Sequence, residues 1–368
     1  MKKKFTIIAI SLASVLTVLI GYHFYSLRTR NVIESLIAQK RMINILVAGS
    51  NVYNNNHHRF CSILSINPDN NHVGFTFLPP SLKLDIDGGG HEFQKLQDID
   101  ISDFSELSNA IEKEIKLSVP FYIELYAVDV ARLVDLFGGV DIFLLNQLHN
   151  NENHKFGLHY YDGKKIVEYI NISDNNSIFQ KYDRIQDIIL SLYYNREHYN
   201  KYINSDFISE AGKSIKTNIM PQEFLSILKL ISGDSVIMTT ILPGEFDDNH
   251  FYSVDNISYK IYEKEFLSRL FRQKSGLASI KVKILNGTNV PGMARRMRNL
   301  LIREGLTVVE FGNSPYPKLH HSVLINQRGN ISNVKKVAKI SGIKKIYHVI
   351  DNTQLHDVLI IIGKDFEK

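Results

Sequence analysis

Three cationic side chains in this sequence could bind a phosphate group, namely Arg59, Lys95 and Arg184. An arginine guanidinium can hold two phosphate oxygens at once, whereas a lysine ammonium acts as a point charge. Arg184 lies within a helical pattern, where an arginine often serves as a surface ion-pair partner. A phosphate site therefore requires that the three side chains converge on one cleft. If they lie far apart around a filled core, phosphate chemistry is hard to sustain.

Other groups of chemically active residues give weaker indications. His149, Glu152 and His154 lack the spacing that places two histidines on one helix face, so we interpret them as part of a polar loop rather than a metal site. Gly88 to Gly90 is not flanked by the strand and helix of a phosphate-binding loop. The sequence contains no nucleophile elbow, P-loop or dinucleotide motif. We therefore predict no metal ligands and name no catalytic residue.

The N-terminus predicts a membrane anchor. Residues 5–27 carry no Asp, Glu, Lys or Arg and are long enough to cross the hydrocarbon core as a helix. A cleaved signal peptide would have a shorter apolar region and a small-residue cleavage site. Three lysines within residues 1–4 favour an N-terminus on the cytoplasmic side. We predict a cytoplasmic tail at 1–4, a transmembrane signal anchor at 5–27 and a stalk at 28–42, with the C-terminal domains extracytoplasmic.

The composition of the chain fits two globular domains. It has 368 residues, of which 44% are hydrophobic and 22% charged, and its formal net charge is +5 with no dense block of one sign. Its single cysteine, Cys61, excludes an intramolecular disulfide. No helix-turn-helix or other basic DNA-reading element is present, so we predict no nucleic-acid partner.

Hydrophobic periodicity predicts an α/β domain at residues 43–245. Alternating or continuous apolar runs indicate strands, and apolar residues three and four apart indicate helices that cover a sheet. Gly138 and Gly139 end one of these helices. The expected strands are 43–48, 61–66, 73–78, 121–126, 140–144 and 235–242, and the expected helices are 103–116, 128–137, 178–194 and 222–231.

A second, smaller α/β module follows. Residues 246–278 read as a connecting helix and a linker, and residues 279–368 alternate again between strand and helix patterns. The helix expected at 292–303 carries Arg295, Arg296, Arg298 and Arg303 on one stripe and apolar residues on the other. We interpret the basic stripe as a solvated face opposite the core, with an anion-binding site as the alternative.

Several motifs resemble those of one protein family. The segments FYIELYAVDVARLVDLFGGVDIFL at 121–144 and HYYDGKKIVEYI at 159–170, together with SINP at 65–68, are similar to the LytR-CpsA-Psr family over residues 44–244. Members of this family move glycopolymers from a polyprenyl-pyrophosphate carrier to the bacterial cell wall. VKILNG at 282–287, PGMA at 291–294 and VLIIIGKDF at 358–366 resemble the C-terminal domain of LytR type that is often appended. The resemblance implies a mixed sheet flanked by helices, followed by a small α/β domain.

The positions that would carry the transfer chemistry are mostly replaced. The resemblance implies arginines and aspartates that bind the pyrophosphate and a metal, and only Arg184 keeps its identity. Arg59 stands where a carboxylate is expected. Bidentate guanidinium contacts and carboxylate ligands to Mg²⁺ are not supplied by amides, hydroxyls or proline. The departures are at Asn51, Pro80, Ser81, Asn171, Ser173 and Asp187.

The chain keeps the sequence pattern of the family fold but lacks most residues of the implied transfer site. This combination favours a protein that does not catalyse the transfer. We predict a single-pass protein of the bacterial cytoplasmic membrane that binds a polyprenyl phosphate lipid, peptidoglycan or another envelope glycan, or an envelope protein. The alternative is a glycopolymer phosphotransferase with a rearranged active site, which would use Mg²⁺ as its cofactor. A deep pocket that opens on Arg184 and collects several cations would favour the alternative.

Overall fold

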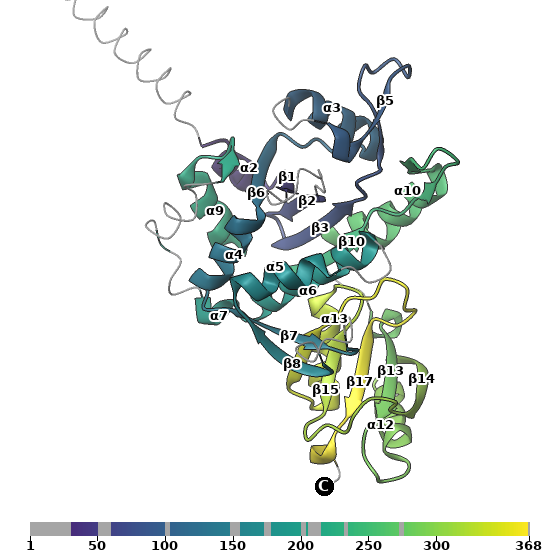
Figure 1. The fold of residues 1–368 in the computed structure, drawn as a ribbon. Coiled ribbons are helices and arrows are strands. Elements are labelled where there is room, and N and C mark those ends of the chain that lie inside the picture. The colour runs from purple at the N-terminus through teal and green to yellow at the C-terminus, as the bar shows by residue number, and fades with distance from the viewer. Residues whose placement is uncertain are drawn as a thin grey trace, which may run out of the picture.

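The computed structural model describes residues 31–50, 60–99, 104–147, 155–172, 178–199, 204, 215–231, 235–271 and 276–366 (Figure 1). Within these ranges no helix is both long and apolar enough to cross a bilayer. The predicted tail at 1–4 and anchor at 5–27 lie outside the described residues. So do Asn51, Arg59 and Ser173.

A six-stranded mixed sheet forms the centre of the first domain. Its strands follow the order β10-β3-β2-β1-β6-β9, with β1 parallel to β6, β10 parallel to β3, and the other neighbours antiparallel. The sequence pattern predicts five of these six strands and misses the short β9. Their bounds are β1 Ile43–Ser50, β2 Phe60–Asn67, β3 His72–Leu78, β6 Phe121–Tyr126, β9 Lys216–Thr217 and β10 Val236–Ile241.

Helices cover both faces of this sheet because successive strand residues point to opposite sides. Leu46 and Ala48 pack in a core with α3 (Phe104–Ile115) and with a helical segment at residues 256–271, which precedes the C-terminal domain. That segment consists of α10 (Asn256–Tyr262), a π-helical turn (Glu263–Leu267) and α11 (Ser268–Phe271). Ile43 and Ile45 face the other side, where they pack with α2 (Val32–Ala38), α6 (Ile178–Tyr194) and α9 (Pro221–Ile231).

The segment from 121 to 171 forms a strand, two helices and a hairpin. Helix α4 (Ala127–Leu136) ends where Gly138 and Gly139 adopt φ of 78° and 93°, a conformation that favours glycine. The strand β7 (Val140–Leu144) then pairs with β8 (Gly157–Tyr161) as a separate antiparallel hairpin. Asp162 caps α5 (Gly163–Asn171) by accepting from the Lys165 amide at 2.9 Å. This cap explains the DGKK motif.

The first domain also contains two short hairpins and one short helix. β4 (Lys83–Asp85) pairs with β5 (Phe93–Lys95), and β11 (Glu245–Phe246) pairs with β12 (Tyr252–Ser253). The short helix α7 (Arg196–Tyr199) follows α6.

The C-terminal domain is a five-stranded sheet with two helices on one face. The strand order is β14-β13-β17-β15-β16, and only the β15–β17 pair is antiparallel. Met297 and Leu301 of one helix and Val334 and Val337 of the other pack on this face. The elements are β13 Lys281–Asn286, α12 Met293–Arg303, β14 Thr307–Asn313, β15 Val323–Asn326, α13 Ile331–Ser341, β16 Lys345–His348 and β17 Val358–Ile362.

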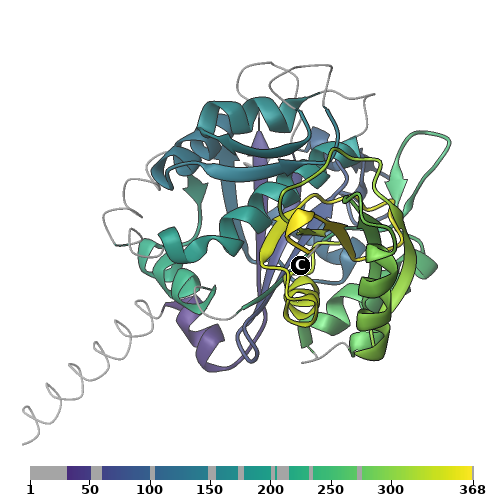
Figure 2. The same cartoon turned by 90° about the horizontal axis from the view of Figure 1, so that it is seen from below.

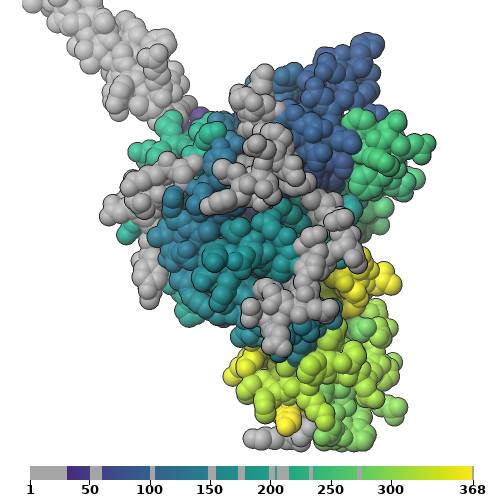
Figure 3. Space-filling view, viewed as in Figure 1, coloured from purple at the N-terminus to yellow at the C-terminus, as the bar shows by residue number. Residues whose placement is uncertain are grey.

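The two domains are joined through the β7–β8 hairpin, which packs against the opposite face of the C-terminal sheet (Figures 1 and 2). Phe143 stacks on Tyr347 with ring centroids 4.8 Å apart, and Phe156 stacks on Tyr316 at 5.5 Å. In the space-filling view the C-terminal domain forms the lower lobe, and the first domain lies directly above it (Figure 3). Buried aromatic contacts of this kind hold a domain interface in one arrangement.

Candidate functional site: a cavity between the two domains

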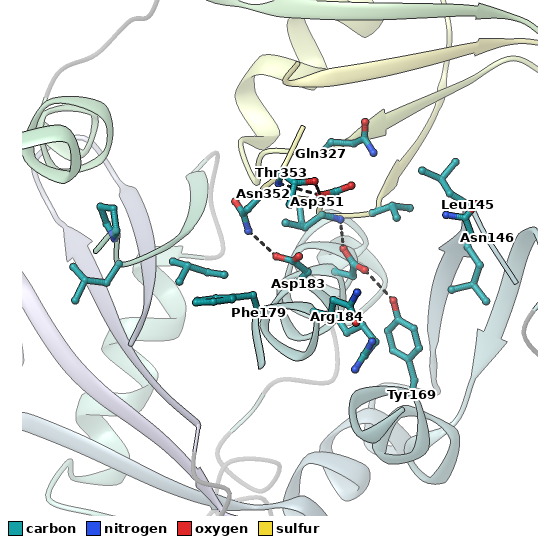
Figure 4. A pocket seen from close by; sticks show the side chains of 18 of the residues that line it. Leu145, Asn146, Tyr169, Phe179, Asp183, Arg184, Gln327, Asp351, Asn352 and Thr353 are labelled. Carbon is teal, nitrogen blue, oxygen red and sulfur yellow. Dashed lines mark hydrogen bonds between the residues drawn. The ribbon is translucent and has the colours of Figure 1, made fainter. Parts of the chain in front are cut away.

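A cavity of about 580 Å³ lies at the junction of the two domains. Helix α6 forms one wall, and the segment after β16, residues 349–353, forms another (Figure 4). Side chains four apart on α6 lie on one face of the helix, which brings Phe179, Asp183 and Asp187 to the same wall. The remaining wall comes from the ends of β7 and β10 and from β12. The lining residues are Leu144, Leu145, Asn146, Tyr169, Phe179, Gln180, Asp183, Arg184, Asp187, Ile241, Leu242, Pro243, Tyr252, Gln327, Val349, Ile350, Asp351, Asn352 and Thr353.

Arg184 reaches this cavity, but its guanidinium binds the end of a helix. Its Nη2 donates to the carbonyl of Ile172 at 2.5 Å and to that of Ile170 at 3.4 Å, at the C-terminus of α5. The last carbonyls of a helix have no intrahelical donor and carry partial negative charge, so a cation there satisfies them. The residue is only 8% exposed. Arg184 therefore has a structural partner at the end of α5.

Asp187 links the first domain to the C-terminal one. Its Oδ1 accepts from the backbone amide of Ile350 at 2.6 Å, and its Oδ2 accepts from the Tyr169 hydroxyl at 2.9 Å. Burial raises the pKa of Asp187 well above its ordinary value, and these two hydrogen bonds only partly oppose that effect. Where the family resemblance implies an arginine, this chain has a buried acid that contacts the neighbouring domain.

Asp183 makes a second link across the same junction. The Asn352 amide donates to Asp183 Oδ1 at 2.6 Å (Figure 4). Burial raises the pKa of Asp183 to about 7, against the lowering effect of the Asn352 hydrogen bond. Burial also acts to raise the pKa of Asp351, but hydrogen bonds from Thr353 and Gln354 bring it below its ordinary value. The cavity thus holds an ionised carboxylate at Asp351 and one that titrates near neutrality.

One buried acceptor in the cavity wall lacks a partner among the described residues. Gln327 is 4% exposed, and its Oε1 receives no hydrogen bond there. A buried polar atom without a partner is costly, so this oxygen is a weak point of the wall at the edge of the cavity. At another part of the wall, Phe179 and Tyr252 form an aromatic group with the exposed Phe246, at centroid distances between 5.2 and 6.4 Å.

The other predicted site residues in the described part lie elsewhere. Lys95 is on β5, with its Nζ 5.4 Å from the centre of the Phe251 ring, and it does not line the cavity. Pro80 and Ser81 form the turn after β3, where their carbonyls accept from the amides of Gln97 at 2.9 Å and Tyr252 at 2.8 Å. The structure therefore does not bring Lys95 to Arg184.

Asn171 lines a second, much smaller hollow of about 40 Å³ near the end of β1. Its Oδ1 accepts from Lys181 Nζ at 3.2 Å, and its Nδ2 donates to the Val167 carbonyl at 2.9 Å. The Phe60 ring lies so close to Gly49 here that a Cβ on this glycine would overlap it. A space of this size accommodates water rather than a sugar or a phosphate chain.

Sequence reasoning missed Asp183, Gln327 and Asn352. They are brought together only by the docking of two domains, and the hydrogen-bonded pair Asp183 and Asn352 is separated by 169 positions. The only local signal was the spacing of Phe179, Asp183 and Asp187 on α6. In the part of the chain that the structure describes, no group of three or more His, Cys, Asp or Glu residues is placed to hold a metal ion.

The fold and this site define a two-domain α/β protein with a polar cavity at the domain junction. Residues 279–366 match the family model described as the LytR cell envelope-related transcriptional attenuator, LytR_C. The C-terminal domain therefore belongs to that cell envelope-related family.

Solved structures show the fold of about two thirds of the chain. A transcriptional regulator, EF0465, from Enterococcus faecalis is 16% identical with a TM-score of 0.52, covering 65% of this chain and 91% of that one. TagV from B. subtilis is 16% identical with a TM-score of 0.51, covering 64% and 99%. TagT bound to LIIa-WTA is 14% identical with a TM-score of 0.50, covering 63% and 91%. The first domain thus has the fold of the LytR-CpsA-Psr proteins TagT and TagV, and the predicted family is confirmed at this level.

The sequence also matches part of one curated protein, and this match gives no information on function. Autophagy-related protein 11 of Vanderwaltozyma polyspora is 28% identical over 188 residues, which are 45% of this chain. The chain spans only 15% of the length of that protein.

Proposed function

We propose that this chain is an extracytoplasmic protein of the bacterial cell envelope that binds an envelope glycan in the cavity between its domains and does not transfer it. The observation that carries this proposal is the chemistry of the cavity wall. Carboxylates and amides line it, and the guanidinium of Arg184 is hydrogen-bonded to α5. The membrane anchor predicted at residues 5–27 would hold both domains outside the cytoplasmic membrane, where peptidoglycan and other envelope glycans are found.

The cavity suits hydroxyl groups better than a pyrophosphate. The side chains of Asp351, Asn352 and Gln327 offer acceptors and amide donors, which pair with sugar hydroxyls. Phe179 and Tyr252 offer ring faces on which the apolar face of a sugar can pack. An ionised carboxylate close to the ligand repels phosphate oxygens, and this repulsion is stronger in a partly buried site than in water.

The second candidate is a glycopolymer phosphotransferase, and the fold likeness favours it. TagT, a structural neighbour, has been solved bound to LIIa-WTA and to LI-WTA, with TM-scores of 0.50 to this chain. Such a reaction requires cations and Mg²⁺ near the transferred phosphate. The hollow at Gly49 and Asn171 supports binding without transfer, because the described residues leave only about 40 Å³ there. An isoprenoid lipid or an envelope protein remains as the other predicted kind of partner.

Calorimetry with the full-length protein in detergent micelles tests glycan binding. Short, uncharged cell-wall oligosaccharides are the probe, and Gln327→Ala is expected to weaken binding about tenfold because it removes an amide side chain that lines the cavity. Asn299→Ala, on α12 outside the cavity, serves as the matched control and leaves binding unchanged.

A transfer assay separates the two candidates. The same protein is incubated with Mg²⁺, a polyprenyl-pyrophosphate-linked glycopolymer and an acceptor glycan, and the products are followed by mass spectrometry. We expect no released polyprenyl phosphate. Turnover above the rate without protein contradicts the non-catalytic proposal and supports the phosphotransferase.

A further inference from the structure

The positive charge of this chain is concentrated in its C-terminal domain. Residues 279–368 contain 15 lysines and arginines against six aspartates and glutamates, a formal net charge of +9. Residues 1–278 contain 28 against 32, a net charge of −4. The total of +5 therefore hides two domains of opposite sign. An anionic ligand is attracted to one domain and repelled by the other.

The cations of the C-terminal domain gather on its two helices. Helices α12 and α13 lie side by side on the same face of the sheet (Figure 2), with their apolar stripes turned inward. Neither helix contains an Asp or Glu. The outward positions hold Arg295, Arg296 and Arg303 on α12 and Lys335 and Lys339 on α13, all exposed, and the exposed Lys344 and Lys345 follow α13. We call these seven residues the basic helical face.

Most of these cations lack a carboxylate partner. Among the described residues, the ion pair of this face is between Arg303 and Glu304 at 3.5 Å, and Arg295, Lys335 and Lys339 form none. Like charges on neighbouring helices repel one another wherever they lie within a Debye length, about 8 to 10 Å at ordinary salt. An extended anion relieves that repulsion by contacting several of them at once.

The chemistry of the face points to a soluble polymer and not to a bilayer. Helices that lie in a membrane surface expose large apolar residues to the lipid. Here the apolar stripes are buried in the core, and Ile302 is the large apolar side chain of α12 or α13 that is more than 40% exposed among the described residues. Arginine forks on one helix also fit the paired oxygens of phosphodiester or carboxylate groups.

We propose that the basic helical face binds a linear polyanion whose repeating units carry phosphodiester or carboxylate groups. This second site lies on the opposite side of the C-terminal sheet from the β7–β8 hairpin and is separate from the cavity. It therefore goes beyond the proposed glycan binding and does not depend on it. The polymer contacts α12 and α13 together, because only the pair presents a two-dimensional array of cations.

Fluorescence anisotropy with the full-length protein in detergent micelles tests this site. Labelled inorganic polyphosphate and labelled polyglutamate are the two probes, titrated over a series of salt concentrations. We expect the logarithm of the binding constant to fall linearly with the logarithm of salt concentration, as counterions are released. The probe that binds more tightly distinguishes phosphodiester-like from carboxylate ligands.

Charge reversal locates the site. The double variant Arg295→Glu/Lys335→Glu changes one residue on each helix and is expected to weaken binding by about tenfold or more and to reduce the salt slope. The control Lys318→Glu/Lys364→Glu changes the net charge equally at exposed positions outside both helices. Thermal unfolding by circular dichroism confirms that both variants fold.

Three results would overturn the proposal. The first is that neither polymer binds at low salt. The second is that the control loses as much affinity as the double variant, which would mean that net charge alone attracts the polymer. The third is that anionic phosphatidylglycerol vesicles bind in co-sedimentation while the soluble polymers do not, which would mean that the face meets a membrane.

Discussion

The interdomain cavity and the basic helical face contain arginines in opposite circumstances. Arg184 is buried, and its guanidinium is hydrogen-bonded to the last carbonyls of α5. Arg295 is exposed on a helix without acidic residues. The residue type is the same, but only the second can exchange water for a ligand without breaking the fold. The neighbours of an arginine, more than its presence in a motif, thus decide whether it can bind an anion.

The largest effect on stability is expected from removal of the Arg184 side chain. Arg184→Ala leaves helix carbonyls without a donor beside the buried Asp183 and Asp187, so we expect a loss of about 3 to 5 kcal/mol of unfolding free energy. Urea denaturation measures it, with Arg295→Ala as the matched control. If Arg184→Ala keeps full stability but loses a phosphate ligand, Arg184 is a ligand-binding residue after all.

A change of pH is expected to alter the free energy of unfolding through Asp183, in the α6 wall of the cavity, by a somewhat smaller amount. The pKa of Asp183 is raised to about 7, so the folded state holds a proton that the unfolded chain releases near pH 4. The contribution of Asp183 to stability is therefore greatest below about pH 4 and falls as pH rises to about 7, by on the order of 2 to 4 kcal/mol, whereas His348 and His356, whose pKa values burial lowers, act in the opposite direction. Asp187, with its raised pKa, acts in the same direction as Asp183.

Denaturation at pH 5 and pH 8 measures this dependence. Asp183→Asn is expected to reduce it, whereas Asp248→Asn, an exposed position, leaves it unchanged. A stability that rises between pH 5 and 8, with Asp183→Asn having no influence, would show that Asp183 is ionised in the folded protein.

Loss of the Asn352 side chain has a more moderate effect. Asn352→Ala removes the hydrogen bond to Asp183 and should cost about 1 to 2 kcal/mol. It also removes an amide from the cavity wall, so oligosaccharide affinity falls in the same variant. Asn299→Ala on α12 provides the control. Unchanged affinity in Asn352→Ala would remove the C-terminal segment from the glycan site.

The smallest effect on stability belongs to the basic helical face. Arg295→Ala is expected to change the unfolding free energy by less than about 0.5 kcal/mol, because the side chain is exposed and forms no ion pair among the described residues. It should still reduce the salt slope of polyphosphate binding by about one. A large destabilisation would mean that this arginine, like Arg184, serves the fold.

Local pattern predicted the elements well and the site poorly, for a physical reason. The alternation at residues 43–48 reflects which side chains meet each face of the sheet, and Gly138 and Gly139 mark a helix end through their own backbone. Both signals act over a few residues. The β7–β8 pairing joins two segments on either side of a long connection, and the contact of Asn352 with Asp183 depends on how two domains dock. A sequence read without an alignment carries no signal of that docking.

The hydrogen bond from the Ile350 amide to Asp187 limits which residues position 187 can hold. An arginine, which the family resemblance implies there, would set a guanidinium against a backbone donor and the buried Tyr169. The C-terminal domain would then have to move away from α6. The identity of residue 187 and the docking of the two domains are thus coupled, so a cation on this turn of α6 and the present junction exclude each other.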